Sequence, residues 1–402
     1  MPLDSMSLGP ASAADERDMP LSGCWSGVTD DHLHSLALAH PEERGRRLIG
    51  SILANLLVAA IAGRWVSYSR NKEFYAGLRR YEGPAFTYRM IIAAVECLEE
   101  RDLIIEQRAK QGSFGWQSRM RASPRLLEIA AGWGPLVPTL YELIHLKDEH
   151  KRRIDYSETD ETLRMRYELA TVNEALAALT LESESLDLSR PIVLLRGGEV
   201  ATRIQHMHRC FNRDFRHGGR CYGPFWQNCP KDERASLRID SCPVAEHDYS
   251  QLHPRLLYAR AGLALAGDAY TIEGVPRRLA KIAWQILMNS SSRREGRHAL
   301  LAHLKSDEPG RSVGLSDADR ILDLLERRHA PVRRAFYSGV GLELQLVDSN
   351  LIMSVLGRCI AKGFVGLPVH DSLIVKCGSE YDLAIQFMEE ELEKLLRKLR
   401  LG

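Results

Sequence analysis

Apolar residues in the N-terminal half change from helical to strand-like spacing along the chain. Positions 41–62 follow a helical pattern, and a second helical pattern, over 84–98, begins with a proline suited to the first turn of a helix. The strand-like residues 103–105 are followed by a polar turn with two glycines and by a second stretch, 116–120. A helix followed by a hairpin with a glycine-containing tip predicts a winged helix within about residues 64–126.

Cationic and aromatic side chains lie together on this predicted hairpin. Cations bind phosphates, and aromatic faces stack on bases. The pattern therefore predicts a nucleic-acid contact; the alternative is a solvated hairpin whose aromatic residues belong to the core. The cations are Arg108, Lys110, Arg119, Arg121 and Arg125, with Phe114 and Trp116 between them.

Composition divides the chain into three parts. Residues 1–40 are rich in Ser, Ala, Asp and Pro, which predicts a flexible N-terminal segment. Residues 41–185 are expected to form a mainly helical domain that ends in a charged, helix-prone connector, 147–185. A short strand at 192–195 opens the second domain, residues 186–402. The fold class predicted for the whole chain is mixed α/β (α+β).

Bulk properties restrict the class of protein. The 402 residues suffice for two or three domains, and a net charge of +1 argues against a coat-like nucleic-acid binder. No secretory pattern is evident, and the most apolar stretch, Leu48–Ala62, is shorter than the ~20 residues that a membrane span needs. Eight cysteines without a CxxC pair favour the reducing cytoplasm, with no membrane partner.

Histidines and cysteines are dense in the middle of the chain, which raises the possibility of structural zinc. Their spacings do not match the paired ligand patterns of zinc-binding modules, so a zinc site is disfavoured. The residues concerned are His206, His208, Cys210, His217, Cys221, Cys229 and Cys242.

Two acidic residues in the C-terminal half lie where predicted strands end. In V-A-E-H-D-Y-S-Q-L-H-P-R a short strand ends at Asp248, just ahead of a helix start. In G-L-P-V-H-D-S-L-I-V-K apolar strands flank His370-Asp371-Ser372, which predicts a β-hairpin with Asp371 at its tip. A rigidly held acid facing a cleft is a natural metal ligand. Taken singly, the first acid is equally explained as a helix cap and the second as a polar turn.

A basic helix is predicted between these two acids. Arg277 and Lys281 are four residues apart in P-R-R-L-A-K-I-A-W-Q-I-L-M-N and therefore project from one helix face. Two cations on one face suit a triphosphate, although a solvated basic face has the same pattern.

The three segments together have the order of polymerase motifs. D-Y-S-Q-L-H-P-R at 248–255 closely resembles motif A of the family A DNA polymerases. R-x-x-x-K at 277–281 resembles the start of motif B, and V-H-D-S at 369–372 resembles motif C in the form nearest the phage-type single-subunit RNA polymerases. The resemblance runs from about Arg203 to the C-terminus, roughly half the chain, and implies a right-hand palm and fingers.

The resemblance also implies a catalytic role for the matched acids. Asp248 and Asp371 would bind two Mg²⁺ ions about 4 Å apart, with Mn²⁺ as a possible substitute, and the backbone carbonyl of Tyr249 would be a further metal ligand. One ion would activate a 3′-hydroxyl, and the other would neutralise the leaving pyrophosphate. His370 would lie near the primer terminus.

Nucleotide contacts follow from the same resemblance, with two departures. Arg277 and Lys281 would hold the triphosphate. His253 stands where family A DNA polymerases carry a glutamate that helps to exclude ribonucleotides, and Asn289-Ser290 stands where the fingers helix bears an aromatic residue and glycine. Both losses point to relaxed sugar discrimination, so acceptance of ribonucleotides as well as deoxyribonucleotides is expected.

Template contacts are implied by two further segments. D-F-R-H-G-G-R-C-Y at 214–222 loosely resembles the Asp-x-x-Gly-Arg template-contacting element of phage-type RNA polymerases, with one extra residue, and places Arg220 at the arginine. Gln345, followed by Asp348 and Asn350, resembles the glutamine-bearing helix beside the primer terminus.

The expected function is a template-directed polymerase or primase, a nucleotidyltransferase whose partners are a DNA or RNA template-primer and nucleoside triphosphates. Two alternatives stay open. One is a non-catalytic nucleic-acid-binding replication or regulatory protein, which retention of both acids disfavours. The other is a template-independent nucleotidyltransferase, which Asn289 and Ser290 favour. The sequence does not identify protein partners.

Overall fold

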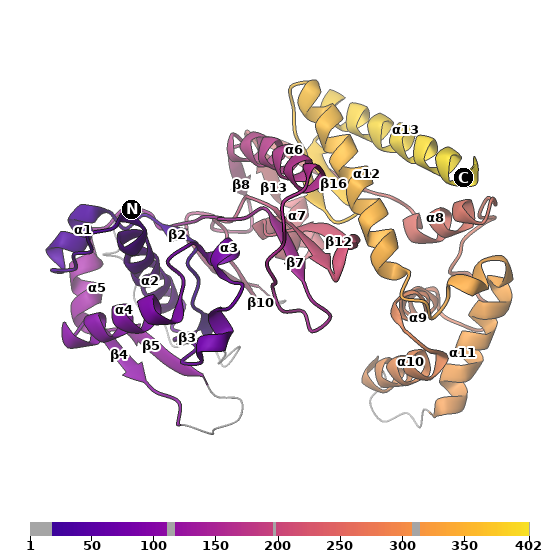
Figure 1. The fold of residues 1–402 in the computed structure, drawn as a ribbon. Helices are drawn as coiled ribbons and strands as arrows, with labels where there is room; N and C mark the ends of the chain where they lie inside the picture. Colours follow the sequence, from indigo (N-terminus) through magenta and orange to yellow (C-terminus); the bar gives the residue numbers. More distant parts are fainter. Residues whose placement is uncertain (1–17, 111–116, 196–197, 308–313, 402) are drawn as a thin grey trace.

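The computed structural model describes residues 18–110, 117–195, 198–307 and 314–401 and has a mixed α/β fold (Figure 1). The tip of the predicted hairpin, with Gly112, Phe114, Gly115 and Trp116, lies outside these residues, as do residues 1–17. The N-terminal elements are β1 (Met19–Pro20), β2 (Trp25–Ser26), α1 (Asp30–Ser35), α2 (Glu43–Ile61), β3 (Val66–Tyr68), η2 (Lys72–Tyr75), α3 (Arg79–Glu82), α4 (Tyr88–Glu100), β4 (Ile104–Gln107), β5 (Ser118–Ala122), α5 (Pro124–Ala130) and β6 (Val137–Pro138).

The predicted helices and hairpin of the N-terminal part are confirmed as α2, α4 and the β4–β5 pair. Helix α2 is apolar on nearly all sides and lies in the middle of the N-terminal core, whereas the capped helix α4 buries one face. Strands β4 and β5 pair antiparallel, with Ile104 opposite Ala122, and β3 joins the free edge of β5. The strand order is β1-β3-β5-β4.

The expectation that residues 1–40 form a flexible segment is wrong for the part from residue 18 onward. Strand β1 pairs in parallel with β3, and α1 begins after a Thr29 capping box. Leu33, Leu36 and Leu38 are buried in the N-terminal core. These apolar residues are few among Ser, Asp and His, so composition alone hides them; they become ordered because α2 offers an apolar surface.

The remaining elements form the C-terminal part. Its hydrophobic core extends from Ile144 to Leu396, separate from the N-terminal core, which ends at Ala130. The elements are β7 (Ile144–Lys147), α6 (Asp160–Ala177), β8 (Leu181–Ser183), β9 (Val193–Leu195), β10 (Gly198–Val200), β11 (His208–Asn212), β12 (Asp214–Tyr222), η3 (Phe225–Asn228), α7 (Lys231–Ala235), β13 (Leu237–Ile239), β14 (Cys242–Asp248), α8 (Leu252–Arg260), α9 (Arg277–Asn289), α10 (Arg293–Asp307), α11 (Leu315–Arg328), η4 (Ala330–Ala335), α12 (Gly341–Ala361), β15 (Leu367–Val369), β16 (Ser372–Lys376) and α13 (Ser379–Leu401).

The boundary between the two parts lies earlier than the expected position at residues 185/186. The stretch 147–185 is not a connector, because α6 buries Met165, Leu169 and Val172 in the C-terminal core and packs against α12. Strand β8 is the edge strand next to β13. High charge on the exposed face of α6 conceals its apolar stripe, which explains the error.

Two sheets organise the C-terminal part. The larger has the order β15-β16-β14-β13-β8, and all its strand pairs are antiparallel. The smaller has the order β12-β11-β7, with α12 packed on β12. Helix α13 packs against β16, α8 and α12. Helices α9, α10 and α11 form a helical lobe, and in sequence they lie between β14 and β15 (Figure 1).

Helix α12 is the one helix, among the described residues, that is long and apolar enough to cross a membrane by length and composition. Half of its most apolar window is buried inside the protein, where it packs against β12, α6 and α13. These contacts are those of a core helix, so the apolar composition is weak support for a membrane span.

A β-bulge in β12 sets which way its side chains point. Cys210 pairs with Arg220 and Phe211 pairs with Gly218, so Gly219 is an extra residue on β12. Its φ of +76° suits glycine, and its carbonyl accepts hydrogen bonds from Arg209 Nε at 2.8 Å and from the Ser349 hydroxyl at 2.5 Å. The bulge is therefore fixed from both β11 and α12.

We expect Gly219→Ala to destabilise the protein by about 2 kcal/mol, because a β-carbon would lie 2.7 Å from Phe211 and would strain a left-handed backbone. Gly357→Ala is the matched control. Gly357 lies within α12 with no atom within 4 Å of the added carbon, so alanine there should be neutral or stabilising by up to ~1 kcal/mol. Chemical denaturation measures both; equal stability of the two variants would contradict the role of the bulge.

Candidate active site

The two candidate acids, 123 positions apart in sequence, meet at one end of the larger sheet. Strand β14 ends at Asp248, which lies opposite Ser372 in the antiparallel pair with β16. The backbone N–H of Tyr249 donates to the carbonyl of Asp371 at 3.4 Å. The predictions of an acid at a strand end and of a hairpin-borne acid are both confirmed, and the two acids are neighbours.

The hairpin that carries Asp371 is held on both sides. Strands β15 and β16 are buried, and the carbonyl of Pro368 accepts hydrogen bonds from the Trp226 and Gln227 side chains, both at 3.1 Å. Val369 pairs with Ser372 across a two-residue turn, in which His370 has φ +57°. A left-handed histidine is uncommon and costs energy, so surrounding contacts must impose this turn.

Electrostatics around the acids favour a bound cation. Partial desolvation and the nearby charge of Asp371 raise the pKa of Asp248, although Lys281 and Lys231 act in the opposite direction. Asp248 is nevertheless exposed to solvent, and Asp371 is half-buried. Two carboxylates that repel each other at an accessible place form a donor set that fits Mg²⁺, which binds oxygen ligands.

Any metal ion here would need ligands besides protein side chains. Within the described stretches, no group of three or more His, Cys, Asp or Glu side chains is suited to hold a metal. Mg²⁺ commonly keeps waters or binds substrate phosphates in addition to one or two carboxylates, so the pair Asp248 and Asp371 is compatible with it.

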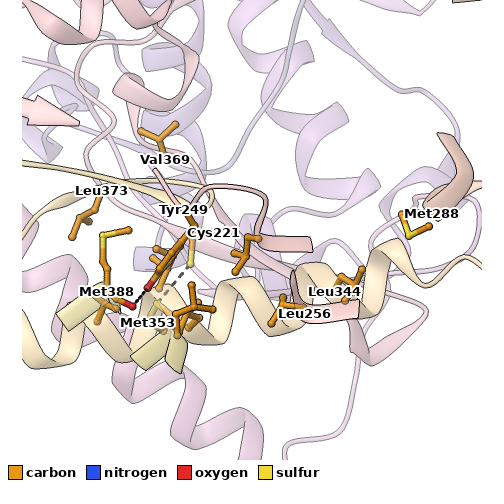
Figure 2. Packing of buried hydrophobic residues seen from close by; sticks show 14 of the residues in the cluster. Cys221, Tyr249, Leu256, Met288, Leu344, Met353, Val369, Leu373 and Met388 are labelled. Carbon is orange, nitrogen blue, oxygen red and sulfur yellow. Dashed lines mark hydrogen bonds between the residues drawn. The ribbon is translucent and has the colours of Figure 1, made fainter. Parts of the chain in front are cut away.

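Tyr249 directs its side chain away from this site. The ring is buried in the core, and its hydroxyl donates to the carbonyl of Met388 on α13 at 2.9 Å (Figure 2). Burial raises the pKa of this phenol well above its ordinary value. The side chain of Tyr249 is therefore directed into the core, and the metal contact expected of its backbone carbonyl stays a prediction.

His370 lies beside the acids with an unsatisfied ring atom. Burial and the charge of Arg220 lower the pKa of His370, so the imidazole is neutral near pH 7. Its ring contacts Tyr222 edge-on, with ring centroids 5.7 Å apart. Nδ1 is buried and has no hydrogen-bond partner among the described residues, which makes it a candidate contact for a ligand.

The helical lobe places one of its two expected cations near the acids. Lys281 is exposed on α9, and its charge opposes the rise in the pKa of Asp248. Arg277 instead pairs with Asp268 at 2.6 Å and lies over the Tyr270 ring. An arginine whose charge is already matched is a weaker triphosphate ligand, so Lys281 is the better placed of the two.

Asn289 ends the same helix and packs against the start of α12. Its amide donates to the Gln285 carbonyl at 2.8 Å, and a β-carbon on Gly341 would lie 2.2 Å from its Oδ1. The following Ser290 is buried. Asn289 thus closes the helix end, and nothing in these contacts replaces the aromatic residue of motif B.

A buried ionic cluster lies next to the acid pair. Asp348 on α12 has no exposed surface and binds both Arg220 and His253. Asp348, together with the charge of Asp371, raises the pKa of Arg220 despite its burial. Gln345 lies three residues before Asp348 and shares its helix face. Three residues expected to contact template or nucleotide are therefore gathered in one place.

Some neighbours of the site were not expected from the sequence. Lys231 begins the short helix α7, and its charge acts on both Asp248 and Glu246. Glu246 pairs with Arg234 at 2.9 Å and accepts a hydrogen bond from Ser372 at 2.8 Å. The only available signal was that Glu246 precedes Asp248 by two residues and so shares its strand face.

The cations of the N-terminal hairpin differ in how far they are already paired. Arg108 binds Glu99 and Glu106, at 2.9 and 2.8 Å. Arg119 binds Asp18 and lies over the Trp65 ring, whereas the exposed Arg121 lies over the same ring at 4.7 Å. Lys110 is the last described residue of the loop that follows β4.

Comparison with known proteins adds no relative: no family model matches the chain, and no curated protein matches it significantly. Function is therefore inferred from the residues of the site.

We expect Asp248→Asn to raise the melting temperature in metal-free buffer at pH 7. The raised pKa means that the folded protein binds a proton at Asp248 more readily than the unfolded chain does, so the carboxylate lowers stability as pH rises through that pKa. After allowance for solvent screening the gain should be about 1–2 °C.

The gain should vanish below about pH 4, near the ordinary value of 3.8, because the wild-type carboxyl is then protonated. Mg²⁺ should stabilise the wild type and leave Asp248→Asn unchanged. Thermal melts over about pH 3–8, with and without Mg²⁺, compare the melting temperatures of the wild type and Asp248→Asn. A variant less stable than the wild type at pH 7 without metal would contradict it.

Proposed function

We propose that this chain is a template-directed nucleic-acid polymerase or primase that transfers a nucleotide from a nucleoside triphosphate to a 3′-hydroxyl. The supporting observation is the meeting of Asp248 and Asp371 at the end of an antiparallel pair, with a cation-bearing helix between them in sequence. Phosphoryl transfer needs positioning and charge stabilisation, and such a pair offers both. We further propose a palm for the larger sheet, fingers for α9–α11 and a cytoplasmic location.

Residue roles follow from where each side chain lies. Asp248 and Asp371 would hold divalent cations, which supply neutralisation of phosphate charge. Lys281 would contact the triphosphate, because it is exposed and acts electrostatically on Asp248. His370 is neutral and keeps an unsatisfied Nδ1, so it would offer a hydrogen bond to the primer end or the nucleotide.

The N-terminal part supports nucleic-acid binding. A winged helix is supported by the order of helix, strand, helices and two further strands, with β5 between β3 and β4 in the sheet. We propose that β4–β5 is the wing and that Arg119 and Arg121 contact phosphates. Both arginines lie over Trp65, which holds their side chains, and Arg121 is the stronger candidate because Arg119 also pairs with Asp18.

A template-independent nucleotidyltransferase is the second candidate. It is favoured by Asn289 and Ser290, whose packing leaves no aromatic residue of α9 at the motif B position. Extension of a single-stranded primer without template would select this candidate. Binding of template-primer without any extension would select the non-catalytic alternative.

Primer extension with Mg²⁺ and all four dNTPs or NTPs tests the proposal. Asp248→Asn and Asp371→Asn should each lower kcat by about 10³-fold or more, because a metal contributes several kcal/mol to such transition states. Glu389→Gln on the exposed face of α13 is the control and should retain activity. Activity that survives loss of either acid would contradict the proposal.

Salt dependence of DNA binding tests the wing. Arg121→Gln should weaken binding and lower the slope of log K against log salt by about 0.9, the contribution of one phosphate contact. Arg108→Gln should change the slope less, because two carboxylates already match the charge of Arg108. Fluorescence anisotropy over a salt series provides both slopes, and an unchanged slope for Arg121→Gln would contradict the contact.

A further inference from the structure

Asp348 joins three elements that surround the acid pair. It lies on α12, and its carboxylate accepts hydrogen bonds from Arg220 on β12, with Nε at 3.2 Å from each oxygen and Nη2 closer still. The same carboxylate lies 2.7 Å from Nε2 of His253 on α8. Asp348 is the shared partner of the arginine and the histidine.

Complete burial makes this carboxylate depend on its partners. A buried carboxylate is tolerated only when it is paired with a cation and hydrogen-bonded. Arg220 supplies the opposite charge, and its side chain is 18% exposed. His253 supplies a further hydrogen bond and keeps 23% of its side chain exposed. In this cluster Asp348 is fully buried, whereas the His253 side chain is accessible to solvent.

The contact with Asp348 fixes the hydrogen-bonding character of His253. A carboxylate accepts hydrogen bonds, so Nε2 must carry the proton in this contact. In a neutral imidazole the other nitrogen, Nδ1, is then an acceptor, since the tautomer is set by the bond that the first nitrogen makes. His253 follows Asp248 by five residues, at the start of the helix that leaves the acid-bearing strand.

A ribose and a deoxyribose differ at such an acceptor. The 2′-hydroxyl of a ribonucleotide is able to donate to Nδ1, whereas a deoxyribonucleotide leaves that nitrogen without a partner when it is covered. In the family that the motifs resemble, a glutamate at this position excludes ribonucleotides. Because a glutamate carboxylate is also an acceptor, its effect must come from crowding the 2′-hydroxyl. A histidine whose ring is held against Asp348 would offer an acceptor without that crowding.

We propose, on the basis of the polymerase function inferred above, that Asp348 is a positioning residue that holds His253 as an acceptor for the 2′-hydroxyl of the incoming nucleotide. Ribonucleoside triphosphates are then the preferred substrate class of this site. Asp348 acts through His253 and does not touch the substrate. The preference for ribose depends on the carboxylate, because an amide at position 348 is able to present a donor that turns the ring or its tautomer.

The test compares single-nucleotide extension by matched ATP and dATP on one template in Mg²⁺, with kcat/KM measured for each. The wild type should prefer ATP by about tenfold or more, the size of one good hydrogen bond. Asp348→Asn and His253→Phe should each bring the ATP/dATP ratio close to unity. Asp348→Glu, which keeps a carboxylate, should retain more of the preference than Asp348→Asn.

Glu142→Gln is the matched control for a merely structural effect. Glu142 is also a buried carboxylate paired with arginines, Arg80 and Arg166, but it lies away from the acid pair in sequence and contacts. Its substitution should lower the melting temperature without moving the sugar ratio. Loss of stability alone lowers both extension rates together, so the ratio separates positioning from folding, and His253→Phe keeps the test decisive if Asp348→Asn folds poorly.

The outcomes distinguish this inference from the function on which it rests. Extension by neither sugar overturns the polymerase function and the inference with it. Extension with equal or greater efficiency for dATP overturns the inference and leaves the polymerase function standing. A preference for ATP that is unchanged in both Asp348→Asn and His253→Phe also overturns the inference, whereas loss of that preference in both variants supports it.

Discussion

The antiparallel pairing of β14 with β16 is the constraint on which the candidate site depends. The register that places Val244 opposite Lys376 also places Asp248 opposite Ser372, and a shift by one residue would turn every side chain of β14 to the other face. The segment between β14 and β15, from α8 to α12, must leave the sheet and return to it without disturbing that register. The buried hairpin and the packing of α13 against β16 keep it fixed.

The site brings several locally unfavourable features together in one place. Away from the site, buried acids such as Glu142 and Glu326 are paired with arginines, Glu142 with Arg80 and Arg166 and Glu326 with Arg293 and Arg333. At the site the charge of Asp371 raises the pKa of Asp248, and His370 combines a left-handed backbone with a buried nitrogen that has no partner among the described residues. Such local costs persist where the surrounding structure overrides them, and they are common where a ligand supplies the missing partner.

Local patterns predicted the elements that carry the site better than they predicted what those elements touch. The end of β14 at Asp248, the tight hairpin at Asp371 and helix α9 are short-range features set by apolar alternation, turn residues and helical spacing. The pairing of Arg277 with Asp268 depends on a loop between helices, which no periodicity describes. Periodicity also does not show which hydrophobic core residues 18–40 and 144–185 join, because only a few apolar residues in each range pack into a core.

Long-range contacts explain the remaining difference. The burial of Asp348 and its bonds to Arg220 and His253 join residues 128 and 95 positions apart. Spacing along one strand or helix contains no such information. The motif resemblance predicted functional roles for Arg220 and His253, and the structure shows that both bind Asp348; their roles stay predictions.

The extra residue at Gly219 restricts which changes in length strand β12 tolerates. An inserted residue normally reverses the alternation of a strand, yet the bulge absorbs it, and Arg220 still faces Asp348. Gly218 and Gly219 both have left-handed backbones, with φ of +82° and +76°, so this bulge requires glycine at two consecutive positions. Deletion of one of them alone would reverse the alternation of the strand and turn Arg220 away from Asp348, so the length of β12 and its two glycines are tied to the buried ionic cluster.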